Sequence, residues 1–136
     1  MKSRLLRGAA VFAGLFGILT IYSGSAVLFG SLEARAAAGN VVPWVLWFNF
    51  LAGFAYIVTA AGLWLGKRWG AWTAAAIAAA TALVFAALGV HAGLGGAFET
   101  RTVLAMTLRT VLWAGIAVLA FRMTNRENMH EHLGAA

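Results

Sequence analysis

The chain has 136 residues, of which 62% are hydrophobic and 10% are charged, and it contains no cysteine. A water-soluble domain of this size needs more polar surface, so the composition predicts an integral membrane protein with one domain over residues 1–136. The missing cysteine excludes disulfides and thiolate metal or redox sites. The net charge of +6 comes from short basic groups between apolar runs, which indicates contacts with the lipid bilayer and no nucleic-acid partner.

Four apolar segments follow one another along the chain, at about residues 8–30, 42–66, 69–92 and 102–121. Each is long enough to cross a bilayer as a helix, so we expect an all-α four-transmembrane-helix bundle with a polar tail over 122–136. The first run exceeds the apolar core of a signal peptide, so we expect it to remain as a span. The segments between the runs are rich in glycine and charge, as turns are.

Basic residues are distributed unequally between the two sides of these predicted spans. One side carries Lys2, Arg4, Arg7, Lys67, Arg68, Arg122 and Arg126, and the other carries Arg35 and Arg101. Cytoplasmic loops of membrane proteins carry the excess of Lys and Arg. We therefore expect both termini in the cytoplasm of a multi-pass protein of the cell inner membrane.

Most of the larger polar side chains within the spans fall in the outer half of the predicted bundle. The candidate ligand-binding residues are Arg109, Asn49, His91, Tyr22, Tyr56 and Trp113. Asn49 shares a helix face with Tyr56 and is either an interhelical clamp or a pocket wall. His91 lies beside a glycine-rich loop and is either an interfacial histidine or a ligand.

Arg109 is the one charged residue well inside a predicted span, and three roles are open to it. It can form a buried pair with Glu33 or Glu99, bind an anionic ligand, or extend to the outer interface as a lipid-facing anchor. Glu33, Glu99 and Arg101 are the candidate ion-pair residues of the outer loops. Their simplest role is a set of weak surface salt bridges.

Small residues at seven-residue spacing form a smooth stripe on the first span: Ala10, Gly17 and Gly24. Helices in lipid associate where small residues let their backbones approach closely. The stripe therefore serves packing inside the bundle or, alternatively, a homodimer contact.

Catalytic and metal chemistry lack their usual residues in this sequence. No acid lies within a span, no nucleophile–base arrangement recurs, and His91 is the one histidine near the membrane, so we expect no catalytic residues and identify no cofactor. The tail sequence MHEH at 129–132 is a weak metal-binding signal, and we assign no metal site. The chain resembles small multidrug exporters in size and span number but lacks their glutamate in the first helix.

These observations predict a small polytopic inner-membrane protein that binds or transports a small amphipathic or anionic ligand through a polar pocket in the outer half of the bundle. The alternative is a non-catalytic accessory or assembly subunit of a membrane complex. A redox subunit associated with haem or quinone is the third possibility. The bilayer, the ligand and a second copy of the chain are the expected partners.

Overall fold

The computed structural model describes residues 2–135, and these residues form helices without any strand. The helices are α1 (Lys2–Phe29), α2 (Leu32–Ala38), α3 (Pro43–Trp64), α4 (Arg68–Gly93) and α5 (Thr100–Ala135). All but the short α2 are long and apolar enough to cross a membrane. The predicted all-α architecture with four long apolar helices is confirmed.

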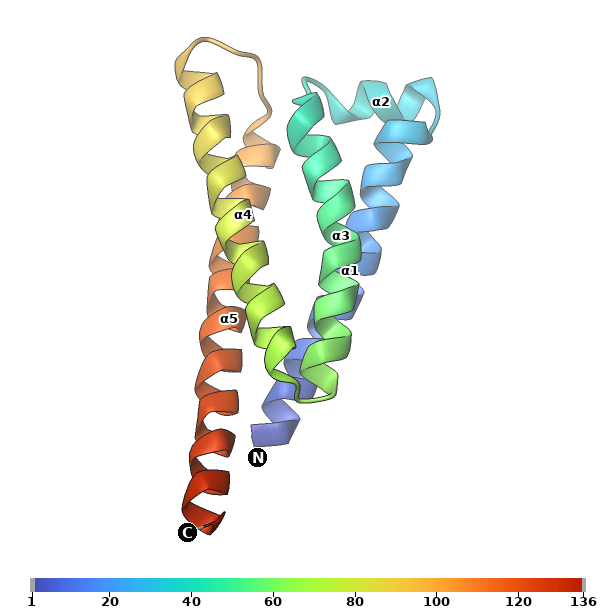
Figure 1. Ribbon diagram of the computed structural model, residues 1–136. Coiled ribbons are helices and arrows are strands. Elements are labelled where there is room, and N and C mark those ends of the chain that lie inside the picture. The colour runs from blue at the N-terminus through green and yellow to red at the C-terminus, as the bar shows by residue number, and fades with distance from the viewer. Residues whose placement is uncertain (1, 136) are drawn as a thin grey trace.

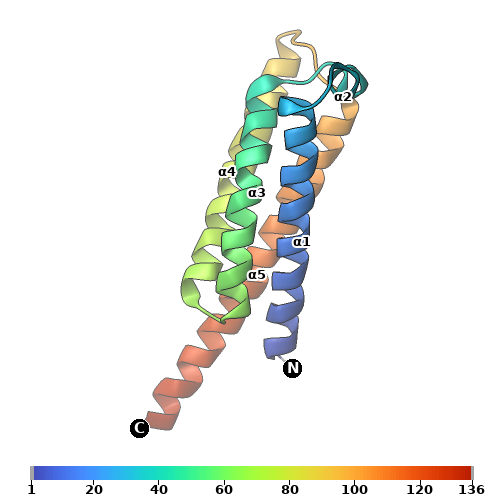
Figure 2. The same cartoon turned by 90° about the vertical axis from the view of Figure 1, so that its right-hand side faces the viewer.

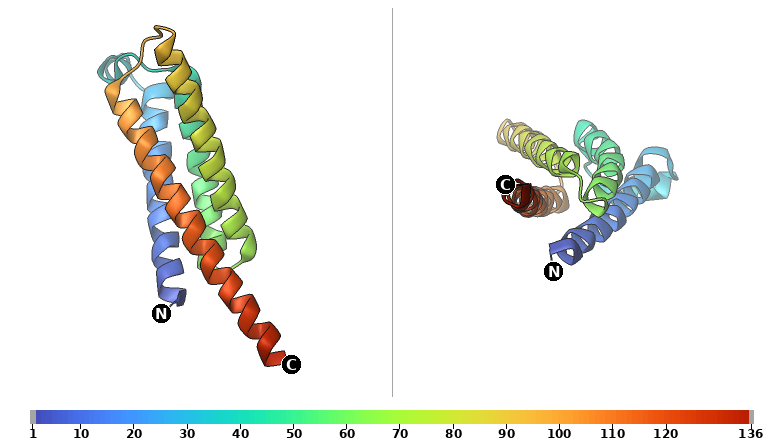
Figure 3. Two further views of the ribbon diagram at one scale, coloured as in Figure 1. Left: turned by 90° about the vertical axis from the view of Figure 1, so that its left-hand side faces the viewer. Right: turned by 60° about the horizontal axis from the view of Figure 1, so that its bottom comes forward.

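The long helices form two pairs that are splayed apart at one end of the molecule. α1 packs along α3, α5 packs along α4, and α3 also contacts α4, whereas α1 and α5 touch very little. Figure 1 shows the two pairs converging near the chain termini and separating toward α2. The right-hand view of Figure 3 shows α3 between α1 and α4. We call the two ends of the bundle the tail end, which holds both termini, and the α2 end.

Glycines bring α1 and α3 into close contact. A Cβ atom on Gly17 would lie 2.8 Å from the carbonyl oxygen of Gly53, and one on Gly24 would lie 3.1 Å from Phe50 Cβ. Ala10, the third residue of the predicted stripe, is also buried. The stripe therefore packs inside the bundle, which is the first of its two predicted roles, and the homodimer stays a prediction.

Apolar side chains join α1 to α5 at the tail end but not at the α2 end. The tail-end cluster contains Leu6, Ala10, Leu63, Ala71, Ala120 and Met123. The cluster nearest α2 contains Val42, Val45, Leu88 and Met106, which come from α3 and the residue before it, α4 and α5. α1 contributes nothing to this second cluster, so its upper part is separated from α5.

Two elements differ from the sequence prediction. Residues 32–38 form α2, where Ser31 accepts a hydrogen bond from the backbone N–H of Ala34 as an N-cap. The last helix continues through the predicted tail to Ala135. Apolarity stops near Phe121, but the following residues include good helix formers and no proline, so the backbone hydrogen bonds continue. Figure 2 shows this end of α5 extending beyond the other helices.

The close approach of α1 to α3 leads to a stability prediction. We expect Gly17→Ala to lower the free energy of unfolding by about 1–3 kcal/mol, because the new methyl group meets backbone and cannot be accommodated by a rotamer change. Gly115→Ala is the matched control, since nothing lies within 4 Å of its added Cβ and alanine favours a helix. Unfolding in a denaturing detergent measures both. Equal stability of the two variants would contradict the glycine-mediated contact.

Candidate functional site

A cavity of about 290 Å³ lies between α1, α3 and α5 at the α2 end. Its polar lining consists of Thr20, Ser23, Asn49, Glu99, Arg101, Thr102 and Arg109. Its apolar lining consists of Gly24, Val27, Ala38, Val41, Leu46 and Ala105. The cavity occupies the space that the separation of α1 from α5 leaves open. Two guanidinium groups and one carboxylate line it, so its charged side chains carry an excess of positive charge.

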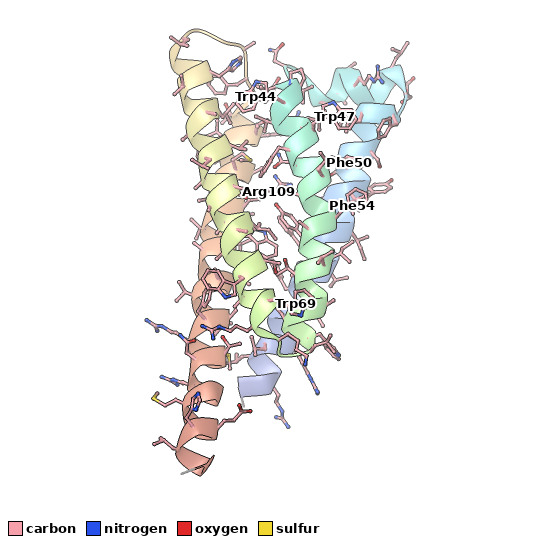
Figure 4. The ribbon with its side chains drawn as sticks, viewed as in Figure 1. Trp44, Trp47, Phe50, Phe54, Trp69 and Arg109 are labelled. Atoms are coloured by element: carbon pink, nitrogen blue, oxygen red, sulfur yellow. The ribbon has the colours of Figure 1, made fainter. Side chains whose placement is uncertain are left out.

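Arg109 extends from α5 into the interior, between the two helix pairs (Figure 4). Its Nε atom is buried and has no hydrogen-bond partner among the described residues. Its Cζ atom lies 5.5 Å from the centroid of the Phe16 ring, which provides a cation–π contact. A side chain turned inward in this way does not face the lipid, so the structure speaks against the anchor among the three roles predicted for Arg109.

Three aromatic rings pack together on the tail-end side of the cavity. Phe16 stacks on Tyr56 with ring centroids 5.6 Å apart, and Tyr56 packs on Trp113 with centroids 4.6 Å apart. Tyr56 and Trp113 are almost completely buried. We call these three residues the aromatic floor. They connect α1, α3 and α5 below Arg109 and separate the cavity from the other half of the bundle.

Buried polar atoms without hydrogen-bond partners gather on α3 and α5, at the cavity and in the floor below it. Among the side chains that the structure describes, they are Asn49 Oδ1 and Arg109 Nε at the cavity, Tyr56 OH and Trp113 Nε1 in the floor, and Thr59 Oγ1 one turn below the floor. Serine and threonine elsewhere satisfy themselves through their own helix, as Thr110 does with the carbonyl of Met106. An unpartnered buried polar atom costs about 1–3 kcal/mol. The Asn49 amide and the Arg109 guanidinium are therefore prepared to bind a polar group in the cavity.

The α2 segment forms a roof over the cavity and is held from both sides. Arg35 donates to the carbonyls of Val27 and Leu28 at the C-terminal end of α1, at 3.2 and 2.8 Å. Glu99 Oε1 accepts a hydrogen bond from Asn40 N at 2.7 Å, and Arg101 donates to the carbonyl of Ala37 at 3.1 Å. Glu99 and Arg101 thus bind backbone atoms of the roof. The sequence predicts surface salt bridges for these two residues instead.

The remaining predicted residues lie away from this cavity. Tyr22 is 73% exposed on the outer surface of α1. The ring of His91 packs against Trp44 and lies 3.1 Å from the carbonyl oxygen of Ala97, so it organises the loop after α4. Glu33 is exposed in the first turn of α2. The structure thus brings together Asn49, Tyr56, Arg109 and Trp113 but not Tyr22 and His91.

Sequence reasoning missed two contributors from α1, Phe16 beneath Arg109 and Thr20 in the cavity wall. Both share a helix face with Gly24 and Val27 at spacings of three and four residues. That spacing was the available signal, but it identifies a face only when the partner helix is known. The chain matches no family model, no curated protein and no solved structure, so the site is interpreted from its own geometry.

Arg109 leads to a second stability prediction. A partly buried guanidinium at mid-helix costs about 2.5–3.5 kcal/mol on insertion scales, and the structure gives its Nε no compensating partner. We expect Arg109→Met to raise the free energy of unfolding by about 1–3 kcal/mol, since ligand-binding groups are often retained at the expense of stability. Delipidated protein in an uncharged detergent is used, with Arg122→Met as the exposed control. A less stable Arg109→Met variant would identify Arg109 as a structural partner.

Proposed function

We propose that the protein is a multi-pass protein of the inner membrane that binds a small anionic or amphipathic molecule in the cavity at the α2 end, on the outer side. The observation that carries this proposal is the buried donor Arg109 Nε, which has no hydrogen-bond partner among the described residues, at a cavity with an excess of positive charge. Arginine recognises carboxylate and phosphate groups through two parallel N–H donors. An anion there would gain charge-assisted hydrogen bonds within a largely apolar surround.

Tryptophans at two levels support the membrane location. Trp44 and Trp47 lie near the α2 end and Trp69 lies near the tail end (Figure 4), and all three are exposed by more than 40%. Along α3, the distance from Trp47 to Trp64 is about 26 Å at the helical rise of about 1.5 Å per residue. Interfacial tryptophans separated by nearly the hydrocarbon thickness are typical of membrane proteins.

The floor and the charge distribution favour binding on one side over passage through the protein. The aromatic floor blocks the cavity from the tail end, so the cavity opens within one half of the bundle. Basic residues gather at the tail end, in the first turns of α1, before and at the start of α4 and late in α5. By the excess of positive charge in cytoplasmic segments, the tail end faces the cytoplasm and the cavity lies on the outer side.

A second candidate is an accessory subunit of a membrane complex, and the projecting end of α5 favours it. Met129 and Leu133 are exposed there by 61% and 72%, one helical turn apart. A helix that extends past its own bundle offers a contact surface for another protein. Two results together would favour this candidate. Truncation after Arg126 would remove a protein that otherwise co-purifies in stoichiometric amount. The small molecules that co-purify with Arg109→Gln would be the same as those of the unmodified protein.

Single cysteines in this cysteine-free chain test the orientation. We expect Ala37→Cys and Leu94→Cys, both exposed at the α2 end, to react with an impermeant maleimide in whole cells. Lys67→Cys, exposed in the turn between α3 and α4, reacts only after permeabilisation. The reverse labelling pattern would place the cavity on the cytoplasmic side and overturn its assignment to the outer side.

Ligand binding is tested by native mass spectrometry and extraction of gently purified protein. We expect an acidic small molecule to co-purify with the unmodified protein and its occupancy to fall about tenfold or more in Arg109→Gln, because a charge-assisted hydrogen bond contributes about 1.5–3 kcal/mol. Arg109→Lys retains the charge but loses the two-pronged geometry, so its occupancy is intermediate. Arg122→Gln, on the exposed part of the same helix, is the control. Equal occupancy in all four proteins would contradict the proposal.

A further inference from the structure

We propose that the ligand is an anionic amphiphile of the bilayer, which places its charged headgroup against Arg109 and its apolar chain between α1 and α5. This inference rests on the proposed function and adds the class of ligand and its route of entry. The inference rests on the position of the polar cavity. α2 covers the cavity at its water-facing end, whereas few contacts close it between α1 and α5, on a side that faces the membrane.

Three boundaries of the cavity are closed by specific contacts. The roof residues Ala38 and Val41 cover it at the α2 end, where Glu99 and Arg101 fasten the adjoining backbone. The aromatic floor closes the opposite end. On the α4 side, the cluster of Val42, Val45, Leu88 and Met106 seals α3 against α4 and α5. The boundary without such a cluster is the seam between α1 and α5.

The seam opens toward the lipid-facing surface of the bundle. α1 and α5 make few contacts, and the apolar clusters that join them lie in the middle and at the tail end of the bundle, below the cavity. Figure 1 shows the upper parts of these two helices apart from one another. Val27 from α1 and Ala105 from α5 line the cavity at this seam, and the nearby Leu108 is 55% exposed. An apolar chain leaving the cavity here would meet apolar side chains and then lipid.

The size and charge of the cavity fit a headgroup better than a whole amphiphile. Pockets for complete drug-sized ligands span about 300–1,000 Å³, and this cavity of about 290 Å³ is at the lower limit of that range. The cavity lining carries two positive charges, on Arg101 and Arg109, and one negative charge, on Glu99. A headgroup with one negative charge would therefore neutralise the cavity. A phosphodiester or carboxylate headgroup has this charge and can accept hydrogen bonds from Arg109 and the Asn49 amide. The rest of the molecule must lie outside.

Photolabelling in nanodiscs tests this inference. The probe is phosphatidylglycerol with a diazirine near the headgroup end of one acyl chain, in a phosphatidylcholine bilayer. We expect labelling to concentrate on α1 and α5 around Val27, Ala105 and Leu108, and to fall about tenfold or more in Arg109→Gln. Arg109→Lys serves as a second variant that retains the charge, and Arg122→Gln is the matched control. The same diazirine on phosphatidylcholine should label all four long helices without dependence on Arg109.

Glycerol 3-phosphate, which has the headgroup chemistry without the chains, separates the two sources of anion. If it stabilises the protein in an Arg109-dependent way while lipid labelling is even around the bundle, entry is from water. The lateral inference is then overturned while the proposed function survives. If neither the lipid labelling nor the stabilisation by glycerol 3-phosphate depends on Arg109, the proposed function and the lateral inference are both overturned. Seam labelling that depends on Arg109, persists in Glu99→Gln and falls in excess glycerol 3-phosphate supports the inference, because the soluble anion then competes with the lipid headgroup for Arg109.

Discussion

The close packing of α1 on α3 determines the rest of this structure. Because Gly17 lets the two backbones meet near Gly53, α1 follows α3 for most of its length and cannot also follow α5. The α4–α5 pair makes its own contact, and α1 packs against it only in the middle and at the tail end of the bundle. A symmetric bundle would have filled the space at the α2 end with side chains. Here the space becomes a cavity, and its polar lining comes from α1, α3 and α5, of which α1 and α5 touch very little.

In the roof, charged side chains form hydrogen bonds with backbone groups instead of salt bridges with one another. Arg35 binds two carbonyls at the end of α1, where helix carbonyls lack partners and a positive charge is favourable. From the start of α5, Arg101 binds the carbonyl of Ala37 at the end of α2, and the neighbouring Glu99 binds Asn40 just after α2. Surface ion pairs contribute little, whereas these contacts satisfy backbone groups at the C-terminal ends of α1 and α2. The roof therefore spans the separation between α1 and α5 without an apolar core of its own.

The four long helices could be predicted from hydropathy because lipid requires each span to satisfy its own backbone. The cavity could be predicted only in part. Asn49 and Tyr56 share a face of α3, and Arg109 and Trp113 share a face of α5. The residue spacing along each helix therefore predicted that the two members of each pair lie close together. Tyr22 and His91 have the right depth in sequence but point elsewhere, since depth does not determine helix rotation. Rotation is set by packing, here by the glycines of α1, which were compatible with either an internal or an intermolecular contact.

The energetic balance at Arg109 connects the fold to the proposed binding. Its contact with Phe16 contributes about 0.5–2 kcal/mol, which does not equal the cost of holding a guanidinium inside the span. The aromatic floor beneath it is tightly packed, so the side chain cannot move toward the tail end. The direction left to it is the cavity, toward which helical side chains on α5 already lean because its N-terminus is at the α2 end. The packing thus holds a positive charge against a polar cavity in this half of the bundle, and an anion bound there would satisfy the charge without any rearrangement of the helices.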